Sequence, residues 1–335
     1  MKYLSQLVIF PVLILMLGAC HQSARQKTPT KGSNDSEIIV KVPAFNADSA
    51  YTFIEKQVAF GPRVPNTPEH AAAAEYLLDK LGSYADTAMI QPFKARAYNG
   101  TVLNGKNIIG SFNPQAKSRI LLCAHWDSRP YADHDPDPAN HNTPIDGAND
   151  GGSGVGVLLE VARQLAGQRP EIGVDIIFFD AEDYGPPQDH QKRGTDNWWA
   201  LGSQYWSKNP HDPDYYAKFA ILLDMVGARD ARFYMEGYSM MYAPGILKKV
   251  WNTAHRAGFT DYFIFEQKGY IDDDHKPINE VMKIPAIDII HMDDASSNGS
   301  FFDHWHTIHD TMDKIGKESL RAVGQTILTV VYEER

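Results

Sequence analysis

Four short, predominantly apolar segments constrain the fold of this chain more than any other feature of its sequence. They are Arg119–Ala124, Val174–Phe179, Phe219–Leu223 and Ala286–Ile290. Strands that are covered on both faces carry such continuous apolar runs, whereas strands with one wet face alternate. Helical patterns flank and separate the runs, at 68–81, 154–166, 246–257 and 317–332. This order predicts an α/β fold, a three-layer αβα sandwich with a mixed, largely parallel central sheet.

The first 40 residues have the composition of an export signal followed by a linker. Lys2 precedes an apolar stretch, Leu7–Leu17, that is too short for a stable transmembrane helix. It ends in Leu17-Gly18-Ala19-Cys20, which resembles a bacterial lipoprotein lipobox, in which Cys20 becomes the lipidated N-terminus. The alternative is a plain secretory signal with an accidental cysteine. We expect a lipoprotein signal peptide at 1–20, a flexible tether at 21–40 and a single α/β domain at 41–335.

The residue after Cys20 predicts where the lipid is inserted. It is His21, and not the Asp that would retain a lipoprotein in the inner membrane. We therefore expect an exported protein, lipid-anchored in the outer membrane and facing the periplasm. The N-terminal lipid is the only membrane contact that the sequence predicts.

Charge and cysteine content exclude several classes of protein. The formal net charge is −10 and no basic block interrupts the chain, which argues against a nucleic-acid partner. Only Cys20 and Cys123 are present, so neither a disulfide scaffold nor a Cys-rich zinc module can form. Cys123 lies within an apolar run, and we expect it to be a small, buried hydrophobic residue.

Acidic residues and histidines gather where the predicted strands end. They occur in His125-Trp126-Asp127, Gly147–Gly154 with Asp150, Asp180–Asp183, Asp224, Asp272–His275 and Trp305-His306-Thr307. Ligands of open α/β sheets bind beyond the carboxyl ends of the strands. The sequence has no nucleophile elbow and no phosphate-binding loop, because the glycine-rich segment lacks the required Lys. Carboxylates and imidazoles without sulfur ligands suit one or two Zn²⁺ ions, with a coordination position left open for substrate.

Each of these residues also has a purely structural interpretation. Asp150 could cap a helix, Asp224 could belong to a turn and His306 could be a surface histidine. Their joint placement at successive strand ends favours a site. The neighbours Glu182 and Asp183 repel each other unless a cation neutralises them. One of the two could face a metal while the other faces substrate as a base.

Taken together, these segments resemble the zinc aminopeptidase (M28) superfamily, in order over about residues 45–333. The matching segments are Phe60–His70, His125-x-Asp127, Gly147–Asp150, Asp180–Asp183 and His306-Thr307. Within that superfamily the chain is most similar to glutaminyl cyclases of the animal type, in a bacterial lipoprotein form. The cues are Leu223–Ala228, Asp273-Asp274-His275-x-Pro277 and the position of Trp305 directly before His306.

The resemblance implies a zinc-dependent enzyme that converts the N-terminal Gln of peptides or proteins to pyroglutamate and releases ammonia. One zinc per chain would be held by Asp150, Asp183 and His306. Asp183 replaces the Glu of animal cyclases, so its strand end must lie closer to the metal. Glu182 would be the general acid and base. The resemblance also implies a hydrogen-bonded carboxylate network of Asp224 and Asp274 near Glu182. Substrate contacts would come from Trp305, from Trp198 or Trp199, and from His125. His125 and Asp127 would support Asp150 or remain near it.

Two alternatives and two positional ambiguities stay open. A dinuclear zinc aminopeptidase would hold a second metal with His125 and Asp224, with Asp150 bridging. A lipid-anchored binding protein on a degenerate enzyme fold predicts the loss of a key residue, and none is lost. Asp272–Asp274 leaves the network residue uncertain by one position, and His304 or His309 could replace His306 as ligand. The sequence does not indicate an oligomeric state.

Overall fold

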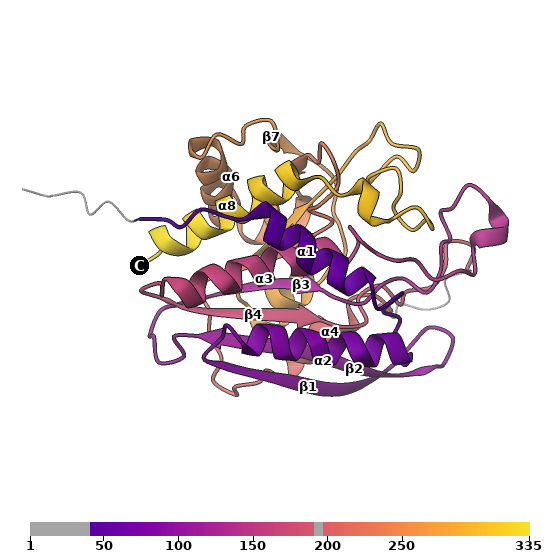
Figure 1. The fold of residues 1–335 in the computed structure, drawn as a ribbon, viewed down its shortest axis with the longest axis horizontal. Coiled ribbons are helices and arrows are strands. Elements are labelled where there is room, and N and C mark those ends of the chain that lie inside the picture. Colours follow the sequence, from indigo (N-terminus) through magenta and orange to yellow (C-terminus); the bar gives the residue numbers. More distant parts are fainter. Residues whose placement is uncertain (1–40, 191–196) are drawn as a thin grey trace, which may run out of the picture. The chain divides into compact units, whose positions relative to one another are not determined.

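The four predicted apolar runs form the parallel part of a six-stranded sheet (Figure 1). They are β3 (Arg119–His125), β4 (Gly173–Phe179), β5 (Ala220–Asp224) and β8 (Ala286–Ile290). β3 pairs in parallel with both β4 and β5, and β5 pairs in parallel with β8. The predicted α/β class and mixed sheet are therefore confirmed.

This computed structural model describes residues 41–190 and 197–335. The predicted signal peptide, Cys20 and the tether lie outside the described residues. Within the described ranges, none of the helices combines the length and the apolar composition that crossing a bilayer requires.

Two antiparallel strands extend the sheet beyond β4, and the sequence patterns above did not predict them. They are β1 (Thr87–Arg96) and β2 (Val102–Phe112), and the strand order is β1-β2-β4-β3-β5-β8. β2 pairs antiparallel with both β1 and β4. β1 is an edge strand in which only one residue of ten, Phe93, is buried. An edge also tolerates Pro92, which cannot donate a ladder hydrogen bond.

Both faces of the central strands are buried, which explains their predominantly apolar sequence. Along β3, Ile120 and Leu122 pack on one face, while Leu121 and Cys123 pack on the other. Cys123 is fully buried, as predicted, and has no disulfide partner among the described residues.

One face of the sheet carries the larger helical layer. It consists of α1 (Ala47–Val58), α2 (Pro68–Gly82), α3 (Gly152–Gly167), α6 (Pro244–Arg256) and α8 (Lys317–Glu333). α1, α3 and α8 pack against one another (Figure 1). The predicted start of α2 is confirmed, because Thr67 accepts a hydrogen bond from the amide of His70 at 3.2 Å and Pro68 occupies the first turn.

The opposite face carries a thinner layer, which completes the sandwich. α4 (Leu201–Lys208) and the helical segments α7 (His275–Pro277) and Ile278–Met282 cover it. Trp206 and Ile278 pack there against Cys123 and its neighbours. The remaining elements are β6 (Phe233–Met235), β7 (Phe263–Gln267), α5 (Gly237–Tyr242) and the single turns Pro138–Asn140 and Met312–Lys314.

This topology collects the polar segments at one edge of the sheet. The carboxyl ends of β3, β4, β5 and β8 lie side by side, and the N-terminus of α3 approaches them closely. A Cβ atom at Gly154 would lie 2.2 Å from the carbonyl oxygen of Leu223. Glycine at this position therefore lets the start of α3, and with it Asp150, reach the end of β5.

Candidate metal centre and substrate pocket

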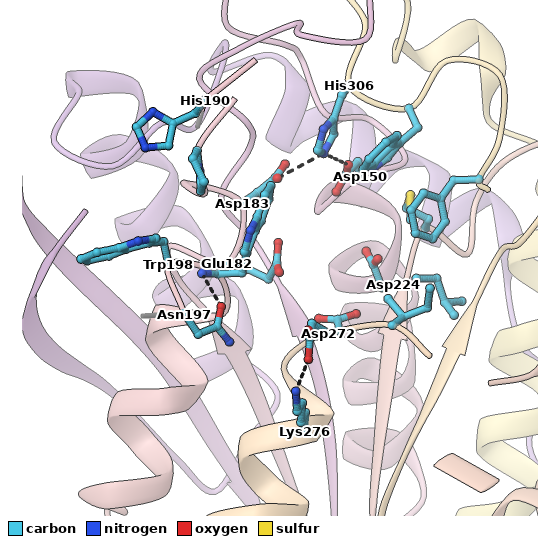
Figure 2. Close-up of a pocket in the computed structure, with 18 residues that line it drawn as sticks. Asp150, Glu182, Asp183, His190, Asn197, Trp198, Asp224, Asp272, Lys276 and His306 are labelled. Carbon is cyan, nitrogen blue, oxygen red and sulfur yellow. Dashed lines mark hydrogen bonds and ion pairs between the residues drawn. The ribbon is translucent and has the colours of Figure 1, made fainter. Parts of the chain in front are cut away.

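Three predicted zinc ligands converge beyond the carboxyl ends of the strands. Asp150 precedes α3, Asp183 follows β4 and His306 lies in the segment before α8. His306 Nε2 lies 3.2 Å from Asp183 Oδ1 and 3.5 Å from Asp150 Oδ2 (Figure 2). One ligand atom of each residue lies within 4.8 Å of the other two, and all three residues are buried.

Asp310 fixes the backbone of the turn that carries Asp150. Its carboxylate accepts hydrogen bonds from the amides of Asn149 and Asp150 at 2.9 and 3.0 Å. Arg63 holds the other side of the turn, because its Nη1 and Nη2 donate to the carbonyls of Asp146 and Gly147. Neither residue was predicted as part of the site. Arg63 lies in the Phe60–His70 segment that carries the family resemblance, whereas Asp310 has no comparable signal.

Asp127 places the two acidic residues that follow β4. Its carboxylate oxygens accept hydrogen bonds from the amides of Glu182 and Asp183 at 3.1 and 3.2 Å. Ala181 has a φ of +56°, a left-handed conformation that non-glycine residues rarely adopt. The turn aims both acidic side chains into the site, and Asp127 supports this turn rather than Asp150.

His306 is held by aromatic rings and by a carboxylate behind it. Its ring stacks on Trp305 with the centroids 3.8 Å apart, and Trp199 lies parallel on another side at 6.3 Å. Its Nδ1 lies 3.5 Å from Asp133 Oδ1, which leaves Nε2 directed at Asp150 and Asp183. His304 and His309 pair with each other instead, with their ring centroids 6.1 Å apart.

The donor set fits a divalent cation. Burial raises the pKa of Asp183 to about 8, and burial together with Asp183 raises the pKa of Asp150. Burial, followed by the charge of Arg129, lowers the pKa of His306 to about 4. Asp183 Oδ2 is buried and has no hydrogen-bond partner within the described part of the chain. A cation here would neutralise the two carboxylates and bind the neutral imidazole, and two oxygens with one nitrogen are ligands that zinc accepts.

A second group of donors adjoins the first and shares Asp150. His125 Nε2 lies 3.1 Å from Asp150 Oδ1 and 3.1 Å from Asp224 Oδ1. These three residues are the ones that the dinuclear alternative requires for its second metal. The predicted substrate contact of His125 is not supported, because the ring is buried beneath Asp150 and Asp224. Those two residues, and not His125, are among the described residues that line the cavity.

A cavity of about 550 Å³ opens beside the three predicted ligands and Glu182. Among the described residues that line it, ten are polar or charged and eight are apolar, so the cavity combines reactive groups with aromatic and aliphatic walls. These walls are formed by Trp198, Trp199, Met225, Ile271, Ile290, Phe301 and Trp305. Both candidate tryptophans, Trp198 and Trp199, therefore line the cavity together with Trp305.

Glu182 lies in the cavity between the predicted zinc ligands and a second set of carboxylates (Figure 2). Burial, and then repulsion by Asp273, holds its pKa well above the usual value for Glu. Asp273 lines the cavity together with Asp224. Asp274 was the predicted network residue, but it is fully buried at the start of α7 and is not among the described lining residues. Asp273 therefore faces the cavity, within the one-position ambiguity that the sequence left, and Asp274 lies behind it, where its charge still acts on Glu182.

Comparisons with known proteins relate the chain to a peptidase family and to solved bacterial enzymes. A model of peptidase family M28 matches residues 107–331. A glutaminyl cyclase from Bacteroides thetaiotaomicron, solved with N-acetylhistamine bound, is 54% identical, with a TM-score of 0.86 over 88% of this chain and 100% of that chain. A Zn-dependent exopeptidase from Parabacteroides distasonis is 52% identical, with the same TM-score and coverage. Glutaminyl-peptide cyclotransferase from Bos taurus is 24% identical, over 81% of this chain and 78% of that protein.

Proposed function

Because the chain belongs to peptidase family M28, we propose that it is a zinc-dependent glutaminyl-peptide cyclotransferase. Its substrates would be peptides or proteins with N-terminal Gln, and its products pyroglutamate and ammonia. The observation that carries this proposal is the position of Glu182, which faces both the three-ligand centre and a cavity walled by tryptophans. The 54% identity with a bacterial glutaminyl cyclase supports the same activity.

One zinc ion per chain would be held by Asp150, Asp183 and His306. When bound there, zinc supplies Lewis acidity for a carbonyl oxygen of the substrate. Asp310 and Asp127 hold the backbone on which two of these ligands stand. The ligands are thus positioned before any metal binds, which favours a defined coordination geometry.

Glu182 would move the proton in both halves of the reaction. The α-amine of the substrate attacks the carbonyl carbon of its own side chain, a C–N bond forms, and Glu182 accepts the proton that the amine loses. Glu182 then donates this proton to the departing nitrogen, and the original amide C–N bond breaks to release ammonia. A carboxyl group that first accepts and then donates a proton needs a pKa near the working pH. Burial, together with repulsion by Asp273, raises the pKa of Glu182 toward that range.

The walls of the cavity favour cyclisation over hydrolysis. Trp199, Trp305 and Phe301 surround the reacting region with apolar surface. Such walls displace water, which otherwise competes with the α-amine as the nucleophile. They also hold the flexible Gln side chain folded back toward its own amine, so that the intramolecular attack loses less entropy.

The dinuclear aminopeptidase remains the second candidate, and one observation favours it. His125, Asp150 and Asp224 present donors for a second ion next to the first. The exopeptidase from Parabacteroides distasonis has the same fold at similar identity. The cyclase proposal uses Asp224 as a pocket carboxylate hydrogen-bonded to His125, and the peptidase would use it as a metal ligand.

A comparison of two naphthylamide substrates distinguishes the candidates. We expect Gln-β-naphthylamide to be cyclised with release of ammonia, and Leu-β-naphthylamide to give no product, because Leu has no side-chain amide for its amine to attack. Ammonia and free naphthylamine are measured separately in the same reactions. Rapid cleavage of the Leu compound would replace the cyclase proposal with the peptidase.

We also propose that the mature protein is attached to the outer membrane, facing the periplasm, by a lipid on Cys20. The support is the lipobox-like sequence before Cys20 and His21 after it. Cys20→Ser is expected to abolish metabolic labelling with a palmitate analogue and to move the protein out of the detergent phase. Cys123→Ser, which alters the other cysteine, serves as the control and should stay in that phase. Unchanged labelling and partitioning of Cys20→Ser would show that Cys20 is not the site of lipid attachment.

A further inference from the structure

Arg129 is a buried cation beside the candidate metal centre, outside the set of residues that bind or react in the mechanism above. Its side chain is 1% exposed. Nε and Nη2 donate to the two carboxylate oxygens of Asp133 at 2.7 and 2.8 Å. Nη1 donates to the carbonyl of Asp183 at 3.1 Å and lies 3.4 Å from Oδ1 of the same residue. Nη2 also donates to the carbonyl of Pro186 at 3.3 Å, so the five N–H groups of the guanidinium have five acceptors.

The guanidinium also lies behind His306, with Asp133 between them. The paired, two-point contact fixes the plane of the Asp133 carboxylate. That carboxylate lies 3.5 Å from His306 Nδ1, on the side opposite the centre, and Nδ1 makes no hydrogen bond within the described part of the chain. A negative charge behind a histidine ligand favours the ring orientation that directs Nε2 at the metal. The guanidinium thus contacts Asp183 directly and His306 through Asp133.

Trp199 packs on the face of this guanidinium. Arg129 Cζ lies 4.8 Å from the centre of the indole ring. Gly185 also packs closely against the indole, because a Cβ atom at this position would lie 2.1 Å from the ring. The backbone at Gly185 therefore prevents Trp199 from moving in that direction. The indole is held between Arg129 and the backbone of the loop, and it forms a wall of the cavity.

We propose that Arg129 is a positioning residue that holds Asp183, His306 and the Trp199 wall in a single arrangement. It thereby sets the zinc affinity of the centre and the orientation of the bound substrate side chain. The substrate part of this proposal rests on the proposed cyclase function, whereas the zinc part does not. A purely structural ion pair would instead stabilise the fold without affecting either property.

The chain offers a matched control for this distinction. Arg119 forms the same kind of two-point pair, with Nε and Nη2 lying 2.7 and 3.0 Å from the carboxylate oxygens of Asp175. Arg119 is the first residue of β3, and the site lies beyond the last. Replacing either arginine removes one two-point ion pair, partly buried at Arg119 and buried at Arg129, but only the Arg129 pair touches the proposed ligands.

The test measures zinc affinity by competition with a chromophoric chelator, in the absence of substrate. We expect Arg129→Met to raise the zinc Kd about 10- to 100-fold, as for other residues that support metal ligands, while Arg119→Met stays within about twofold of the wild type. At saturating zinc, we expect kcat of Arg129→Met for a Gln substrate to remain at least about tenfold lower, because a displaced wall misaligns the attack. Equal zinc affinity in Arg129→Met and Arg119→Met would overturn the proposal.

Arg129→Lys provides a second test if the Met variant fails to fold. Lysine keeps the charge but cannot reproduce the planar fork or its stacking on the indole. We expect the zinc Kd of Arg129→Lys to exceed that of Arg119→Lys by about tenfold. No difference between these two variants would reject the proposal. If the wild type fails to cyclise Gln substrates, the proposed function fails, and the zinc comparison still decides the role of Arg129.

Discussion

Replacing Glu182 by Gln is expected to lower kcat for a Gln substrate by about 10²- to 10⁴-fold, the range in which a positioned acid or base contributes. The amide has nearly the same shape as the carboxyl group, but it can neither accept the proton of the α-amine nor return it to the leaving nitrogen. Zinc should remain bound at the wild-type stoichiometry, because Glu182 is not among the three predicted ligands.

Asp272→Asn is the matched control for this loss. Asp272 also lines the cavity, but its side chain is 55% exposed and pairs with Lys276 at the rim. Its replacement should change kcat by less than about threefold, because exposed ion pairs contribute little. The measurements are initial rates of ammonia release and zinc content of each purified variant. Wild-type turnover by Glu182→Gln would remove this residue as the base.

The central strands could be predicted because their buried environment selects a recognisable apolar pattern in the sequence. Burial on both faces requires continuous apolar residues, and the run from Arg119 to Ala124 corresponds to β3 within one residue. β1 has no such apolar run, since only one of its ten residues is buried, and Pro92 lowers its β-strand propensity. Edge strands of this kind are held by pairing with β2, which is a tertiary property that local sequence does not show.

The residues of the metal centre could be predicted because strand ends of a parallel sheet share one edge. Asp183 lies at this edge because it follows β4, whereas the start of α3 and the segment before α8 bring Asp150 and His306 to it; the family resemblance had indicated all three. The directions of individual side chains were less predictable. Asp273 and Asp274 are neighbours of the same type, and only the start of α7 decides which of them faces the cavity.

The supporting residues could not be predicted from local patterns. Arg129, Asp133 and Asp310 act on ligands that are distant in sequence, through contacts that exist only in the folded chain. Two other features break the usual backbone preferences. Ala181 and His306 adopt left-handed φ values of +56° and +55°, which no sequence rule assigns to Ala or His. Such strained positions cluster at functional sites, where the surrounding hydrogen bonds maintain them.

The largest effect on metal binding is expected from the loss of His306. Zinc sites with four ligands bind with about 10–16 kcal/mol, so one ligand accounts for about 2.5–4 kcal/mol. His306→Ala should therefore raise the zinc Kd by about 60- to 700-fold, at tenfold per 1.4 kcal/mol. The flanking histidines are suitable controls. His304→Ala and His309→Ala should bind zinc like the wild type, because their rings pair with each other.

The stoichiometry of the same preparations tests the number of metals. We expect elemental analysis to find one zinc per chain in the wild type, His304→Ala and His309→Ala, and a substoichiometric amount in His306→Ala. Two zinc ions per wild-type chain would assign His125 and Asp224 to a second metal and favour the peptidase, since their donors already adjoin Asp150. Retention of zinc by His306→Ala with loss in His304→Ala would instead show that the ligand is His304. His304 and His306 are only two positions apart in the sequence, but only His306 faces the other two ligands in the structure. A difference in zinc binding between the two variants would therefore report on the folded site and not on the sequence position.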